Sequence, residues 1–301
     1  MIWFFVAILS YFIFALTAIL DKYILHPDGL EPKIYAFYDS IFGILLIFLL
    51  FLKEFRIDSQ LIIFAVLAGI FKISAIFVFY NALLHFETSR ILPTIGGFLP
   101  CLTFFFTFLQ NPYNITEITF SRFLSFLFLI FGSFLINYEK KKINLPAIMI
   151  SILASLLFSL YLIFSKILYS NTQFLQGLVW ILLSAGLFSL IFLFSKGVKT
   201  EILKERKILN KKITLPFLLN KTLAMLGGLA QHYAIFLAPI SLLAFINALE
   251  GIKYVFILIM TIFLSIKFKN IFKEEIKKEA LLIKIISVIL IFIGIFIFYY
   301  F

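Results

Sequence analysis

The sequence predicts an all-α polytopic membrane protein, in which ten transmembrane helices form two inverted five-helix repeats. Three observations predict this fold: the composition, the long apolar runs and a similarity between the two halves. Of the 301 residues, 63% are hydrophobic and only 14% are charged, and the mean hydropathy is +1.12. A soluble domain is close to half apolar and a quarter charged. This chain therefore has too few polar residues to cover a surface that faces water.

Ten apolar runs divide the chain from end to end. A helix of about 20 apolar residues crosses the hydrocarbon core of a bilayer, and each run approaches or exceeds that length. The runs cover residues 2–20, 34–52, 61–83, 91–109, 119–137, 147–168, 174–195, 215–237, 240–266 and 281–300. Only connectors remain between the runs, so we expect no soluble domain. The predicted location is a membrane, which would be the inner membrane in a bacterial cell.

The two halves of the chain share sequence features. When Ala7–Leu25 is aligned with Ser151–Tyr169, the identical pairs include Lys22 with Lys166. A second similarity aligns the end of the third span and the fourth span with the eighth and ninth spans. Each half contains five spans, an odd number, so the second copy must cross the membrane in the opposite sense. The predicted repeats are 1–142 and 143–301, and inverted repeats are typical of secondary transporters.

The links between spans 3 and 4 and between spans 8 and 9 are short and carry small residues. The second link reads Ala238-Pro239-Ile240-Ser241 and leads to Ala248-Leu249-Glu250-Gly251; Pro93, Gly96, Gly97 and Pro100 follow the first. With the Lys that closes spans 1 and 6, these features resemble the drug/metabolite transporter superfamily, and its EamA-type permeases in particular. The resemblance covers essentially the whole chain. It implies a ten-helix permease with both termini in the cytoplasm.

Lys and Arg residues are concentrated on one predicted face of the membrane. The links after the odd-numbered spans carry about 19 of them, and the links on the opposite face carry about 4. Cytoplasmic loops are enriched in Lys and Arg, so this count predicts a cytoplasmic Lys-rich face and external termini. The resemblance implies the reverse. Both orientations stay open here, and we favour the charge count.

Several ionisable and amide side chains fall inside the predicted spans. An ionisable residue in a span is costly unless it is paired or hydrated, so each one is a candidate for substrate binding or ion coupling. The candidates are Glu250, Lys253, Lys72, His232, Gln231 and Asn247. One hypothesis is that they line a central aqueous cavity. The alternative is that Glu250 pairs with Lys72 or Lys253 and holds helices together, and both can be true.

The charges of these candidates favour one class of solute. Two Lys residues and one Glu carry a surplus of positive charge, which favours a solute with a carboxylate or phosphate group. We therefore expect a secondary transporter of a small polar metabolite, anionic or zwitterionic, such as an amino acid. The alternatives are a structural or assembly membrane protein without transport, and an exporter of cationic drug-like compounds.

Other function classes lack their sequence signals. No HExxH or GxSxG motif occurs, so we expect no enzyme and no catalytic residues. The single cysteine, Cys101, is too few for a thiolate metal site, and we expect neither a metal nor a cofactor. No nucleotide-binding P-loop is present. The expected partners are membrane lipid, a small solute and, as the coupling ion, protons; the net charge of +11 does not indicate nucleic acid, because the Lys residues separate apolar runs.

Overall fold

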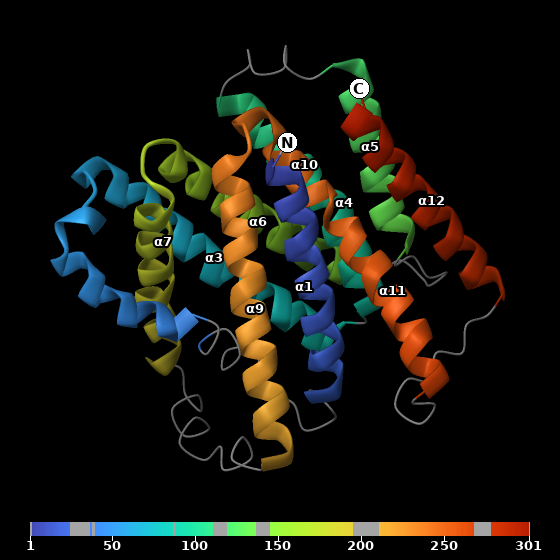
Figure 1. Cartoon of the computed structure of the whole chain (residues 1–301), viewed down its shortest axis with the longest axis horizontal. Coiled ribbons are helices and arrows are strands. Elements are labelled where there is room, and N and C mark those ends of the chain that lie inside the picture. The colour runs from blue at the N-terminus through green and yellow to red at the C-terminus, as the bar shows by residue number, and fades with distance from the viewer. Residues whose placement is uncertain are drawn as a thin grey trace.

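The computed structural model describes residues 2–24, 37, 40–86, 88–110, 119–136, 145–194, 211–267 and 278–300. Within these ranges every regular element is a helix (Figure 1). The ten α-helices are α1 (Ile2–Ile24), α3 (Ser59–His85), α4 (Thr88–Gln110), α5 (Phe120–Ile136), α6 (Leu145–Ser170), α7 (Phe174–Ser189), α9 (Lys211–Leu237), α10 (Leu243–Ala248), α11 (Glu250–Lys267) and α12 (Lys278–Tyr300). The 3-10 helices are η1 (Ile41–Phe51), η2 (Lys53–Phe55), η4 (Leu190–Phe194) and η5 (Ile240–Leu242).

Among the described residues, six segments are long and apolar enough to cross a bilayer by themselves. They are Ile2–Leu20, Ser59–His85, Leu145–Ser170, Phe174–Phe194, Ile240–Met260 and Leu282–Tyr300. Helices α4 and α5 contain shorter apolar stretches. Hydrocarbon offers no hydrogen-bond partners to the backbone, and a helix pairs its own N–H and C=O groups. The prediction of a multi-pass integral membrane protein is confirmed.

Two of the predicted runs differ from a plain α-helix. The described part of the second run, 34–52, is the 3-10 helix η1, which rises about 22 Å at the 3-10 pitch. It packs closely on α7, where a Cβ on Gly186 would lie 2.8 Å from the Ile44 amide nitrogen. The ninth run, 240–266, is divided into η5, α10 and α11, and the α-helix is interrupted at Leu249.

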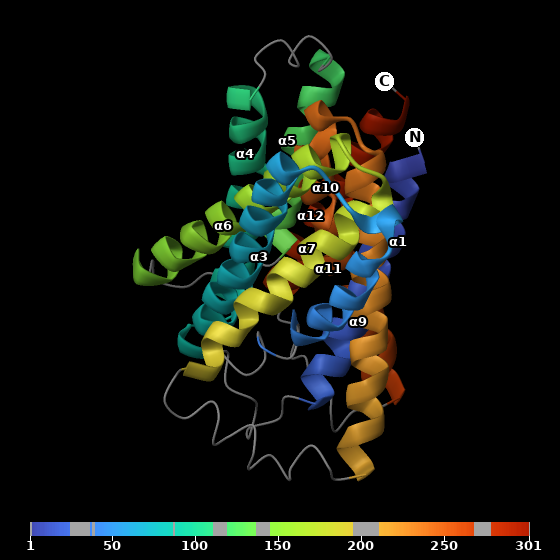
Figure 2. The ribbon, with the colours of Figure 1, turned by 90° about the vertical axis from the view of Figure 1, so that its left-hand side faces the viewer.

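The helices pack in pairs that lie far apart in the sequence. Helix α1 packs against α9 and α11, and α6 packs against α3 and α4. Helix α5 packs against α12, and α4 packs against α10. Figure 1 and Figure 2 both show α1 and α9 side by side. The short α10 lies among these pairs, and all of its residues are buried.

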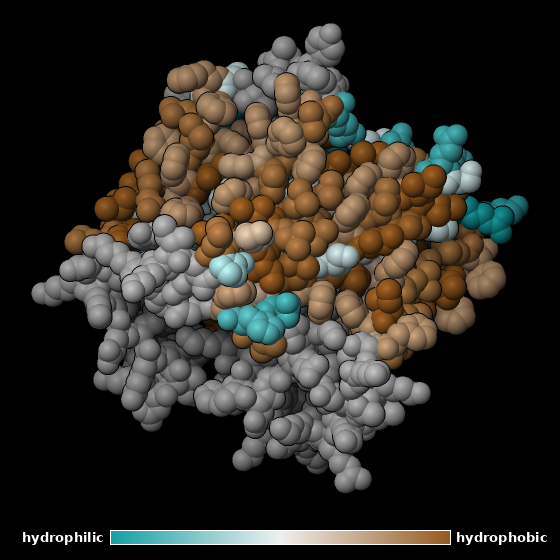
Figure 3. All heavy atoms as spheres, turned by 180° about the vertical axis from the view of Figure 1, so that it is seen from behind, coloured by the Kyte–Doolittle hydropathy of each residue, from teal (hydrophilic) through white to brown (hydrophobic). Residues whose placement is uncertain are grey.

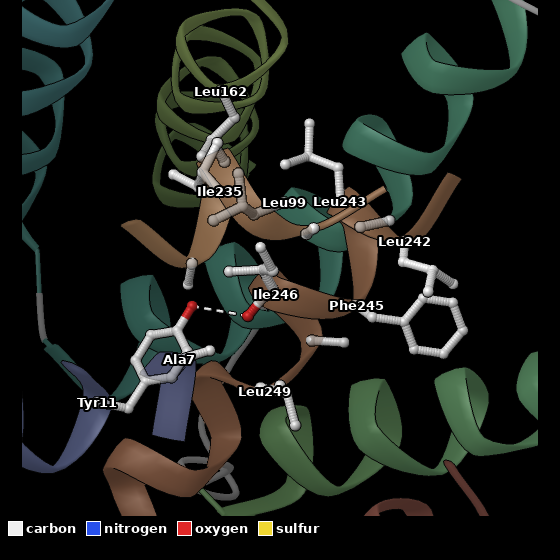
Figure 4. Packing of buried hydrophobic residues seen from close by; sticks show 14 of the residues in the cluster. Ala7, Tyr11, Leu99, Leu162, Ile235, Leu242, Leu243, Phe245, Ile246 and Leu249 are labelled. Atoms are coloured by element: carbon white, nitrogen blue, oxygen red, sulfur yellow. Dashed lines mark hydrogen bonds between the residues drawn. The ribbon is translucent and has the colours of Figure 1, made fainter. Parts of the chain in front are cut away.

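Apolar side chains cover both the interior and the outside of the bundle. In the core, Phe245 and Ile246 of α10 pack with Leu99 of α4 and Leu162 of α6 (Figure 4). Seen from behind, the outer surface is largely brown, with only scattered polar residues (Figure 3). Because water cannot solvate so continuous an apolar surface, lipid is its natural surroundings.

The first and last described residues lie towards the same end of the bundle (Figure 1). The C-terminal ends of α6 and α9 lie towards this end as well. The side chain of Lys22 lies outside the described residues, as do the Lys-rich links 137–144, 195–210 and 268–277 that enter the charge count.

Candidate functional site

The interruption of the ninth span is stabilised by side chains from two other helices. Where α10 ends, its last carbonyl groups lack partners within the helix. The Tyr11 hydroxyl of α1 donates a hydrogen bond of 2.7 Å to the Ile246 carbonyl (Figure 4). The Ser133 hydroxyl of α5 lies 3.4 Å from the Ala248 carbonyl and donates to Leu129 in its own helix. Leu249 itself keeps right-handed helical backbone angles, and its amide donates to the Phe245 carbonyl, so the interruption is a local irregularity within one continuous span.

Gly251, directly after the break, lets α11 approach α5 at this point. A Cβ at this position would overlap the Ser133 hydroxyl oxygen and would lie 3.1 Å from a methyl group of Ile291. Only a glycine fits against both neighbours without a shift. The site thus depends on contacts of α11 with α5 and with α12.

Glu250 and Lys253 form an ion pair at the start of α11. Their i,i+3 spacing places both side chains on one face of the helix, as the sequence predicts. The Tyr254 hydroxyl lies 3.4 Å from the same carboxylate oxygen, and the Lys253 ammonium lies 4.9 Å from the centre of the Tyr254 ring. The side chains of Lys253 and Glu250 remain 19% and 17% exposed. The carboxylate also lies at a helix N-terminus, where the helix dipole favours negative charge.

His232 of α9 is held between two tyrosines of α6. Its Nε2 atom lies 3.0 Å from the Tyr161 hydroxyl, and its Nδ1 atom lies 2.9 Å from the Tyr169 hydroxyl. A neutral imidazole has one donor and one acceptor nitrogen, so one tyrosine accepts a hydrogen bond and the other donates one. All three side chains are at most 7% exposed.

Lys166, on the same helix α6, closes the end of α9. Its ammonium donates to the carbonyl groups of Phe236 at 2.9 Å and Ile235 at 3.2 Å. These are among the last carbonyls of α9, which have no partner inside the helix. In the sequence, Lys166 marks the repeat, because it aligns with Lys22, but nothing there predicts this contact.

Gln231 and Lys72 lie near these groups. The Gln231 side chain hydrogen-bonds to the Tyr11 hydroxyl, and the charge of Glu250 also acts on Tyr11. The ammonium of Lys72, on α3, interacts electrostatically with the His232 imidazole. Tyr11 thus connects α1 and α9 with the irregular turn in the ninth span, although no sequence pattern distinguishes it from the other tyrosines.

Asn247 belongs to a separate group of polar residues between α4, α6 and α10. Its amide donates to the Thr103 hydroxyl at 2.7 Å, and that hydroxyl donates to the Leu99 carbonyl at 2.8 Å. Ser159 of α6 lies 3.1 Å from the Thr103 hydroxyl. Asn247 is 3% exposed, so it stabilises the packing here. A hydroxyl residue in a membrane helix is too common for the sequence alone to identify Thr103.

Comparisons with known proteins support the fold. No family model matches the chain, and no curated protein matches it. Among solved structures, the chain is similar to a protein known from a crystal structure, with a TM-score of 0.66 and 12% sequence identity. The match covers 99% of this chain and 99% of the other. At this identity the similarity extends to the fold alone.

Proposed function

We propose that the protein is a secondary transporter that moves a small polar metabolite by alternating access. The observation that carries the proposal is the Glu250–Lys253 ion pair, which is largely buried beside the irregular turn at Leu249 in the ninth span. Charged residues inside a membrane span are expensive and usually serve a function. In secondary transporters, substrate and ion sites lie near the middle of the bilayer at the interface between the repeats.

The packing of the helices supports an arrangement of two inverted repeats, 1–142 and 143–301. In such an arrangement α1 corresponds to α6, α3 to α9 and α4 to the ninth span. The contact of α1 with α9 then corresponds to that of α6 with α3, and the contact of α1 with α11 corresponds to that of α6 with α4. This is also the arrangement that the resemblance to EamA-type permeases of the drug/metabolite transporter superfamily implies.

We further propose that the solute carries a carboxylate or phosphate group, as in an anionic or zwitterionic metabolite such as an amino acid. Lys72 and Lys253 contribute positive charge from α3 and α11. A solute with a negative group gains from these ammonium groups, whereas a purely cationic solute meets like charge at low dielectric constant. Because the bound solute relieves the cost of the buried ammonium group, it binds the occluded state more tightly, which gives that state its differential affinity.

The test begins with a thermal-shift screen of the purified protein against amino acids, nucleosides, phosphorylated sugars and organic cations. Solutes that stabilise the protein are then tested for exchange in proteoliposomes. We expect an anionic or zwitterionic solute to exchange, and Lys72→Gln and Lys253→Gln to weaken its exchange without lowering protein abundance. If both variants carry lipophilic cations as well as the unmodified protein does, the protein exports cationic compounds. If no solute exchanges, a structural role replaces the proposal.

A further inference from the structure

Gly228, inside α9, has open space where a side chain would lie. A Cβ at Gly228 meets nothing within 4 Å, whereas a Cβ at the neighbouring Gly227 would lie 3.0 Å from the Phe14 ring of α1. A glycine inside a helix is less stable than an alanine. Close packing explains this cost at Gly227 but not at Gly228, so the space beside Gly228 needs another explanation.

This space lies inside the bundle and not on its lipid side. Gly228, His232 and Ile235 are spaced i, i+4 and i+7, so they share one face of α9. Both His232 and Ile235 are buried; the imidazole of the first bonds to α6, and the carbonyl of the second accepts a bond from α6. The opposite side of α9 faces outwards, where Leu226 is 46% and Tyr233 is 39% exposed.

The charged groups of the proposed solute site adjoin this space. Gln231 lies one turn after Gly228 on α9, and its side chain hydrogen-bonds to the Tyr11 hydroxyl. The charge of Glu250 acts on the same hydroxyl. From α3, the charge of Lys72 acts on the same part of α9. A solute that binds these groups with its polar end therefore extends its other end towards Gly228.

Towards the end of the bundle that holds the termini, this face of α9 is closed. Lys166 of α6 donates to the carbonyl groups of Ile235 and Phe236. The ring of Phe236 lies 5.9 Å from that of Tyr169 and 5.6 Å from that of Phe174, measured between ring centres. Helices α6, α7 and α9 thus meet in a layer of aromatic rings beyond the space.

In the other direction, the same face of α9 is less buried. Ala224 and Lys221 precede Gly228 by four and seven residues, and both are partly exposed. Ile235, seven residues after Gly228, is fully buried. The accessible part of this face therefore begins at Gly228, which gives water a route to the space.

We propose that the space beside Gly228 receives the uncharged end of the solute, and that Gly228 limits how large this end can be. The inference rests on the transport function proposed above. Water fills the space when no solute is bound. The positive charges of Lys72 and Lys253 together outweigh the negative charge of Glu250, so the space attracts the negative group of an anionic or zwitterionic solute.

Thiol labelling tests whether water fills the space. Cys101 is first replaced by serine, and Gly228→Cys and Leu226→Cys are compared in proteoliposomes that hold a methanethiosulfonate reagent on both sides. A thiol reacts as the thiolate, which forms in water, so we expect Gly228→Cys to react at least about tenfold faster than Leu226→Cys. An anionic reagent should react at least about threefold faster than a cationic one, after each rate is divided by that for free cysteine.

Counterflow tests the size limit. Proteoliposomes loaded with an unlabelled amino acid take up radiolabelled L-alanine or L-phenylalanine. We expect Gly228→Leu to lower the ratio of L-phenylalanine uptake to L-alanine uptake at least about tenfold, because the leucine side chain fills the space. Leu226→Phe is the matched control, since it adds bulk on the lipid side of the same helix, and it should leave the ratio unchanged.

Three results would overturn the proposal. If Gly228→Cys reacts no faster than Leu226→Cys, lipid and not water fills the space. Equal corrected rates for the two reagents would show that the ammonium groups do not adjoin the space, and an unchanged uptake ratio in Gly228→Leu would show that Gly228 does not limit solute size. If the unmodified protein exchanges neither amino acid, amino acid transport is wrong, and the labelling rates still decide whether the space belongs to a water-filled site.

Discussion

Gly251 is the residue of the site at which the neighbouring atoms leave no room for a side chain. Gly251→Ala should lower the free energy of unfolding by about 1–3 kcal/mol, because the new methyl group overlaps the Ser133 hydroxyl. Thermal unfolding in detergent measures the change. The matched control is Gly228→Ala, since a Cβ at Gly228 meets nothing within 4 Å. Adding Ser133→Gly should restore part of the loss; equal stability of the two alanine variants would contradict the close approach of α11 and α5.

Glu250 tests both roles suggested for the ion pair. Glu250→Gln leaves the Lys253 ammonium without its carboxylate, and we expect a loss of about 1–3 kcal/mol in unfolding free energy. The double variant with Lys253→Gln should recover part of that loss, which a double-mutant cycle measures.

In proteoliposomes, Glu250→Gln should abolish uphill transport and leave exchange intact. Unchanged uphill transport at equal protein abundance would limit Glu250 to a structural role.

At this scale the sequence predicts pairs within one helix and misses partners on other helices. The i,i+3 spacing of Glu250 and Lys253 predicts a shared face, and the two residues do pair. Tyr161, Tyr169 and Tyr11 carry no comparable signal. With 13 tyrosines in an apolar chain, nothing in the sequence indicates which hydroxyl meets the imidazole of a helix that lies far away in the sequence.

At the scale of the element, Lys166 joins α6 to the end of α9. Lys166→Met keeps the length of the side chain but leaves the Ile235 and Phe236 carbonyls without their donor. An unsatisfied buried polar group costs about 1–3 kcal/mol, so the variant should unfold at lower temperature. Hydrogen exchange should increase at the last turn of α9. Lys221→Met, on the same helix, is the control, and equal exchange in the two variants would contradict the cap.

Hydropathy predicts where the elements lie but not their internal hydrogen bonding. Apolar length fixes α3 and α12 to within a few residues, because lipid demands a helix wherever the run is long enough. The same signal cannot distinguish the 3-10 helix η1 from an α-helix. It also does not predict the irregular turn at Leu249, because Tyr11, which donates to the Ile246 carbonyl next to that turn, comes from a distant part of the chain.

At the scale of the whole molecule, an even number of crossings accounts for the position of the two ends of the chain. Residue 2 begins α1 and residue 300 ends α12 towards the same end of the bundle (Figure 1). The similarity between the halves predicts this result, since two five-span repeats return the chain to its starting side. Which side that is depends on charge and not on packing, because the helices pack identically in either orientation.

The orientation is decided by a reporter that is active only in the cytoplasm. In the predicted topology, the links opposite the two ends carry about 19 of the Lys and Arg residues, and such loops stay in the cytoplasm. A fluorescent protein that matures only there, fused after Phe301, should therefore give no signal, whereas a fusion within 195–210 should be bright. A bright C-terminal fusion and a dark internal one would contradict the charge count and favour the cytoplasmic termini that the EamA resemblance implies.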